Sequence, residues 1–171
     1  MAYVDLKAAF DSVDRNALWL LLASSGLPPD IINLFKALYT DILNCVRVNG
    51  YDSEWFLVLN GVKQGCVVVS DLFLNPMDWL LERTVHRGMV GTSVGSEPFS
   101  DLDFVDHVAL LSEMLSLLVL ALEIMDEEAR SLGLIINWSK TKIQTMLDPT
   151  PVSNQVTING HSVEVVESFP L

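Results

Sequence analysis

The residues of this chain best suited to chemistry are two aspartates that lie at the ends of predicted strands. Asp5 ends a short apolar segment, and Asp106 lies with His107 between the apolar stretches of segment 102–111. This segment predicts a β-hairpin with Asp106 and His107 at its tip. Carboxylates are the ligands that Mg²⁺ prefers, and two such ions can activate a hydroxyl and stabilise a leaving pyrophosphate. Two aspartates roughly a hundred residues apart are by themselves weak support for such a site.

The surrounding pattern predicts the elements that must position these side chains. Asp14 is a candidate helix cap, and the Gly26 to Pro29 region ends its helix. A second helix is expected to pack through an apolar face formed by Ile31, Leu34, Phe35, Leu38 and Ile42. The other predicted elements are two strands around a turn at 49–50, a helix over 70–87, a linker over 88–100, a helix over 115–132, strands in 134–147 and a turn at 159–160.

This mixture of strands and helices predicts an α+β fold, with helices packed on one face of a ferredoxin-like antiparallel sheet. In that arrangement the first strand and the hairpin are neighbours, which brings Asp5 and Asp106 to one edge of the sheet. The length of 171 residues fits a single domain, and half of the residues are hydrophobic.

Composition limits the partners and the compartment. The net charge is −12, and the ten lysines and arginines are scattered rather than clustered, so weak binding to nucleic acid is expected. Two cysteines, Cys45 and Cys66, without metal-type spacing favour an intracellular protein, nuclear or cytoplasmic. The N-terminus lacks the basic region of a signal peptide, so secretion is not expected. The longest apolar run, 114–125, is too short to span a bilayer.

Four segments together resemble the reverse transcriptases of non-LTR (LINE-type) retrotransposons. Segment 4–15, VDLKAAFDSVDR, is similar to their first catalytic motif, and GVKQGC at 61–66 is similar to their second. Segment 102–111 resembles the third motif, and Gly133-Leu134 with Asn137 and residues 140–142 resembles the fourth. The resemblance covers nearly the whole chain, in order. It implies a palm domain, RNA-directed DNA polymerase activity, Mg²⁺ with Mn²⁺ as an alternative, and an RNA template, a DNA primer and deoxynucleoside triphosphates as partners.

The resemblance also implies a role for each matching residue. Asp5 and Asp106 would be catalytic metal ligands. Phe10 would lie under the sugar of the incoming nucleotide, where a core position is the alternative. Gln64 and Gly65 would let the backbone approach template and nucleotide, with an ordinary tight turn as the alternative. Either Lys140 or Lys142 would face the triphosphate, and a solvated lysine is the alternative for both.

The decisive departure from the family pattern is His107, which replaces the second aspartate of the catalytic pair. Imidazole is a poor Mg²⁺ ligand and suits softer metals. Further departures are Val105, in place of a small residue, Asp71, in a stretch where the family has a small or apolar residue, and Pro76, inside the predicted helix over 70–87.

The sequence therefore predicts a partial reverse transcriptase domain over 1–171, a palm with most of the fingers and thumb missing and with a degenerate, impaired active site. The first strand begins almost at residue 1, which led us to expect missing sequence upstream. Two alternatives stay open: a non-enzymatic fragment that binds a protein partner through exposed apolar surface, and a decayed copy without function.

Overall fold

The computed structural model describes residues 1–63, 68–94, 97–104, 107–145 and 154–167. Its centre is a six-stranded sheet with the strand order β11-β12-β10-β1-β9-β8. These strands are β1 (Ala2–Asp5), β8 (Asp101–Phe104), β9 (His107–Leu110), β10 (Lys142–Gln144), β11 (Gln155–Ile158) and β12 (His161–Val166). Neighbouring strands are antiparallel except for the parallel pair β10 and β12. The predicted α+β fold with an antiparallel sheet is confirmed.

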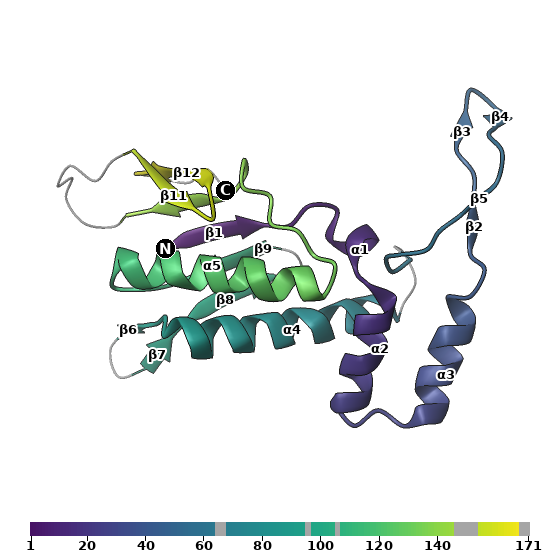
Figure 1. The fold of residues 1–171 in the computed structure, drawn as a ribbon, viewed down its shortest axis with the longest axis horizontal. Helices are drawn as coiled ribbons and strands as arrows, with labels where there is room; N and C mark the ends of the chain where they lie inside the picture. The colour runs from purple at the N-terminus through teal and green to yellow at the C-terminus, as the bar shows by residue number, and fades with distance from the viewer. Residues whose placement is uncertain (64–67, 95–96, 105–106, 146–153, 168–171) are drawn as a thin grey trace.

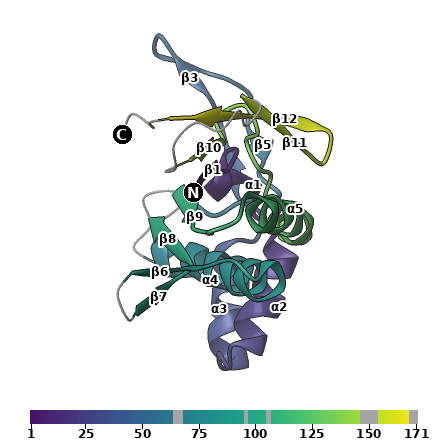
Figure 2. The same ribbon diagram turned by 90° about the vertical axis from the view of Figure 1, so that its left-hand side faces the viewer.

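Two long helices, α4 (Val69–Gly88) and α5 (Leu115–Ser131), lie side by side against one face of this sheet (Figures 1 and 2). Their apolar sides and the inner face of the sheet form the core, in which Phe73, Leu110, Leu122, Met125 and Ile143 are almost fully buried. Both helices were predicted from the sequence, α5 from its helical periodicity. Pro76 is buried within α4, which continues past it to Gly88, and the exposed Asp71 lies in the first turn of α4, where a negative charge is favourable.

The segment between the first strand and α4 forms an arm beside the sheet (Figure 1). It contains α1 (Ala9–Ser12), α2 (Arg15–Ser24), α3 (Pro29–Leu38) and the short strands β2 (Leu43–Asn44), β3 (Arg47–Val48), β4 (Tyr51–Asp52) and β5 (Phe56–Leu57). The Asp14 carboxylate accepts a hydrogen bond of 2.9 Å from the Ala17 N–H, as expected of a helix cap. The predicted turn at 49–50 joins β3 to β4.

Two predictions about elements are wrong. The face expected to pack α3 is largely exposed, since Ile31, Leu34 and Leu38 are open to solvent while Ile32 is buried. Periodicity identified the helix, but it did not identify the side that has a neighbour. The expected linker over 88–100 contains a small hairpin of β6 (Thr92–Val94) and β7 (Glu97–Phe99).

None of the helices in the described residues is long and apolar enough to cross a membrane.

Candidate active site

The first strand and the hairpin strands of segment 102–111 are neighbours as predicted, and their register places Asp5 directly opposite His107. Strand β9 pairs with β1 on one side and with β8 on the other, with Asp5 and Phe104 both in register with His107. Directly opposite residues of an antiparallel pair project on the same face of the sheet. His107 is exposed and is the first residue of β9, paired with Phe104 of β8, so it lies within the strand rather than at the tip where it was predicted. Asp106, like Val105, lies outside the described residues.

The Asp5 carboxylate is held from the segment that follows α5. The Asn137 Nδ2 donates a hydrogen bond of 2.8 Å to Asp5 Oδ2, and the Lys140 Nζ lies 3.7 Å from the same oxygen. The main-chain N–H of Asn137 also donates to the Asp5 carbonyl, at 2.7 Å. The Asp5 side chain is 18% exposed, so its carboxylate is partly shielded while it remains accessible.

The structure separates the two candidate lysines. Lys140 contacts Asp5, whereas Lys142 lies in β10, in register with Tyr3 of β1 and Glu164 of β12. The Lys142 Nζ pairs with the Glu164 carboxylate at 2.5 Å. Of the two lysines, Lys140 is therefore the one beside the carboxylate edge.

Phe10 lies in α1 and stacks on Phe73 of α4, with ring centroids 4.2 Å apart and an interplanar angle of 26°. The chain that leads toward Gln64 and Gly65 is tied to this helix, because Val62 N–H donates to the Phe10 carbonyl at 2.7 Å. Gly61, with φ of +80°, lies so close to α1 that a Cβ there would be 2.6 Å from the Asp11 carbonyl oxygen. Gln64 and Gly65 themselves lie outside the described residues.

The sequence predicted no role for Arg15, which holds the backbone of segment 58–61. Its guanidinium donates to the backbone carbonyls of Gly61 at 2.8 Å, Val58 at 3.0 Å, Asn60 at 3.0 Å and Tyr39 at 3.1 Å. It also lies over the Tyr39 ring, 5.1 Å from the centroid, and burial lowers the pKa of the Arg15 side chain. Because these partners are main-chain carbonyls, no pairing of residue types in the sequence could have indicated them.

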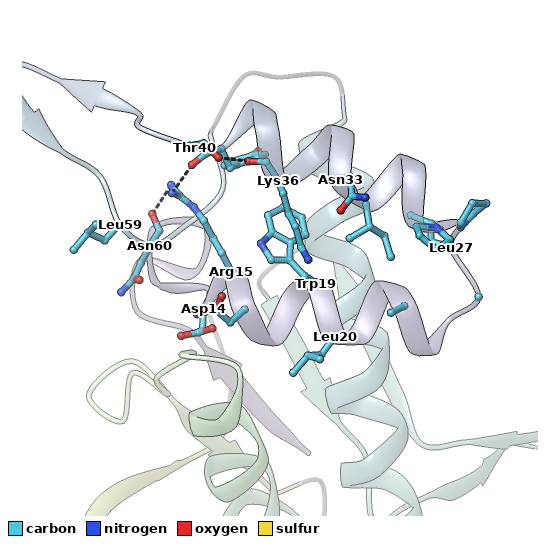
Figure 3. Close-up of a pocket in the computed structure, with 17 residues that line it drawn as sticks. Asp14, Arg15, Trp19, Leu20, Leu27, Asn33, Lys36, Thr40, Leu59 and Asn60 are labelled. Carbon is cyan, nitrogen blue, oxygen red and sulfur yellow. Dashed lines mark hydrogen bonds between the residues drawn. The ribbon is translucent and has the colours of Figure 1, made fainter.

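A groove of about 1040 Å³ lies between α2 and α3, beside the Arg15 contacts. Figure 3 shows Arg15 and Trp19 projecting from α2, Lys36 from α3, and the hydrogen bond from Arg15 to Asn60. Asp5 and His107 are not among its lining residues. The groove is therefore distinct from the edge that carries the carboxylate.

The candidate metal ligands in the described residues do not fit a pair of Mg²⁺ ions. One carboxylate, Asp5, and one imidazole, His107, meet at this edge, whereas Mg²⁺ requires a shell of hard oxygen ligands. Within the part of the chain that the structure describes, no cluster of three or more His, Cys, Asp or Glu residues could hold a metal ion.

The sheet, the two helices on one face and the aspartate at the strand edge define the palm of a polymerase. The chain belongs to the reverse transcriptase (RNA-dependent DNA polymerase) family, whose model matches residues 1–163. Within that family it is of the non-LTR retrotransposon type, as its relatives show. It is 28% identical over 176 residues to the retrovirus-related Pol polyprotein of the type-1 retrotransposable element R2 of Nasonia vitripennis, covering 95% of this chain and 17% of that protein.

A second relative is the Pol polyprotein of the type-2 element R2DM of Drosophila melanogaster, 30% identical over 113 residues, covering 66% of this chain and 10% of that protein. The chain thus spans a fifth or less of these relatives. Two solved telomerase structures share the fold. The Candida albicans structure, in complex with a fragment of telomeric RNA, has a TM-score of 0.65 at 13% identity, covering 95% of this chain and 29% of that one. The apo Candida tropicalis structure has a TM-score of 0.61 at 16% identity, with coverages of 95% and 33%.

Proposed function

We propose that this chain is a reverse transcriptase palm whose capacity for two-metal nucleotidyl transfer is severely impaired. The observation that carries the proposal is the register of β1 and β9, which puts an imidazole directly opposite the Asp5 carboxylate. In the family pattern this position holds a carboxylate. Imidazole is neutral or positive, so it supplies neither the hard oxygen ligand nor the negative charge that Mg²⁺ requires. A loss of about 4 kcal/mol in transition-state stabilisation would slow the reaction about a thousandfold.

The substrates of the proposed ancestral reaction are an RNA template, a DNA primer and deoxynucleoside triphosphates. Lys140 is a better candidate than Lys142 for facing the triphosphate of the nucleotide, because Lys140 lies beside Asp5 while Lys142 is paired with Glu164. Phe10 is proposed to limit the space under the nucleotide sugar, and its stack on Phe73 would hold the ring in place. Gln64 and Gly65 keep their proposed role in template and nucleotide contact.

Primer extension on an RNA template by the purified chain tests this proposal. Wild type is compared with Asp5→Asn, which removes the described carboxylate, and with His107→Asp, which restores the family residue. We expect the wild type to match Asp5→Asn in giving no template-dependent product. We also expect His107→Asp alone to stay inactive, because an acidic chain with ten scattered basic residues should hold template and primer only weakly. Robust synthesis by the wild type that Asp5→Asn abolishes would overturn the proposal.

A second candidate function, docking to a protein partner, is favoured by the exposed apolar surface of the arm. Most of the large apolar side chains exposed in the described residues come from this one segment: Leu20, Ile31, Leu34, Leu38, Leu43, Val46, Val48, Tyr51, Trp55, Phe56, Leu57 and Leu59. An accumulation of exposed apolar side chains in one segment favours an interaction site. Analytical ultracentrifugation with a hydrophobic dye tests it, since a monomer that binds no dye would count against docking through the arm.

A further inference from the structure

The segment between α5 and β10 wraps around the end of the first strand. Lys7 N–H donates to the Ile135 carbonyl at 2.8 Å, and Asn137 N–H donates to the Asp5 carbonyl at 2.7 Å. Between these bonds, Leu6 forms an isolated antiparallel bridge with Ile136. The main chain therefore fixes the distance between Asn137 and Asp5 before any side chain contributes.

The Asn137 side chain is held in turn by its own neighbours. Ser139 Oγ donates to Asn137 Oδ1 at 2.8 Å, so the amide oxygen is occupied and the amide nitrogen points at Asp5. The Asn137 carbonyl accepts from Lys140 N–H at 3.0 Å and from Thr141 N–H at 2.9 Å. Thr141 is fully buried, and its hydroxyl donates to the same carbonyl at 3.0 Å. An amide held on both sides has little freedom to turn away from the carboxylate.

We propose that Asn137 is a positioning residue for Asp5. Its Nδ2 and the Lys140 ammonium both meet Oδ2, which fixes the rotamer of the carboxylate. Among the described residues these contacts leave Oδ1 for a cation or a polar ligand. Asparagine suits this role because it donates one directed hydrogen bond without adding charge. The inference rests on the proposed function only in taking Asp5 as the functional carboxylate of the palm.

The test measures the Asp5 Hα–Hβ couplings by NMR, which report the χ1 rotamer of that side chain. We expect a single rotamer in the wild type and rotamer averaging in Asn137→Ala. The side chain in Asn137→Asp has nearly the same shape but lacks the N–H donor, so the Asp5 rotamer should average in this variant too. The exchange variant Asp5→Asn with Asn137→Asp restores one donor and one acceptor, and it should recover a single rotamer at position 5.

Asn33→Asp is the matched control, because it adds the same charge at an exposed position of α3. It should leave the Asp5 couplings unchanged, and unchanged amide shifts of the core strands should show that every variant folds. If Asn137→Ala fails to fold, the couplings at position 5 are compared between the wild type, Asn137→Asp and the exchange variant. An Asp5 side chain that keeps its single rotamer in both Asn137→Ala and Asn137→Asp would overturn the inference. That result would leave the primer-extension test untouched, so the two proposals fail separately.

Discussion

The departure from the family pattern that bears most directly on the candidate site is His107, and its consequence depends on the residue opposite. Had the strands paired one residue out of step, His107 and Asp5 would project on different faces of the sheet. The observed register puts them on the same face. The sequence predicted that these two strands are neighbours, because the apolar stretches around Asp106 and His107 indicated a hairpin and the mixture of elements indicated a ferredoxin-like sheet. It could not predict the contact of Asn137 with Asp5, which depends on how the chain turns after α5.

Gly61 illustrates how one residue holds the loop against α1. Gly61 and Gly50 have nearly equal φ angles, +80° and +83°, but a Cβ on Gly61 would meet the Asp11 backbone while Gly50 has open space. Gly50→Ala should cost about 1 kcal/mol, from backbone strain alone. Gly61→Ala should cost about 1–3 kcal/mol more, because the loop must move away from α1. Urea denaturation of both variants measures the difference, and equal losses of stability would show that the crowding at Gly61 is unimportant.

At the level of elements, the sequence predicted α2, α3, α4 and α5, but apolar periodicity did not predict which face of α3 is covered. In α3 the strongest apolar face is exposed, since its neighbours are α2 and the groove rather than the sheet. The hairpin of β6 and β7 was missed because its Gly- and Ser-containing sequence is also typical of a linker. Element identity is therefore a local property of this sequence, whereas packing partners are set by the whole fold.

Arg15 of α2 connects the helices of the arm to segment 58–61, so Arg15→Lys should loosen that connection. A lysine ammonium is compact and cannot reproduce the fork of donors that reaches four carbonyls. We expect a loss of about 1–3 kcal/mol, because three part-buried carbonyls lose their donor, together with faster amide hydrogen exchange in 58–61. Arg47→Lys is the matched control, since Arg47 is 72% exposed and pairs with Asp52 on the surface. If both variants show the same stability, Arg15 does not hold the loop.

The whole molecule combines a polymerase fold with a charge that opposes nucleic acid. At −12, the chain should repel a phosphate backbone over most of its surface. We expect fluorescence anisotropy with an RNA–DNA duplex to give a dissociation constant of about 100 µM or weaker at physiological salt. Submicromolar binding that weakens steeply with salt would instead indicate a cationic track that the net charge conceals.

The most direct test of the role of His107 is a Mg²⁺ titration of the wild type and of His107→Asp. Amide chemical shifts in NMR spectra report Mg²⁺ binding at the β1–β9 edge. We expect His107→Asp to show saturable Mg²⁺-dependent shifts around Asp5, and Asp5→Asn in that background to abolish them. The wild type should show no such shifts over the same concentrations, because the imidazole replaces a carboxylate ligand. Wild-type binding of Mg²⁺ at Asp5 as tight as that of His107→Asp would contradict an active site impaired by His107.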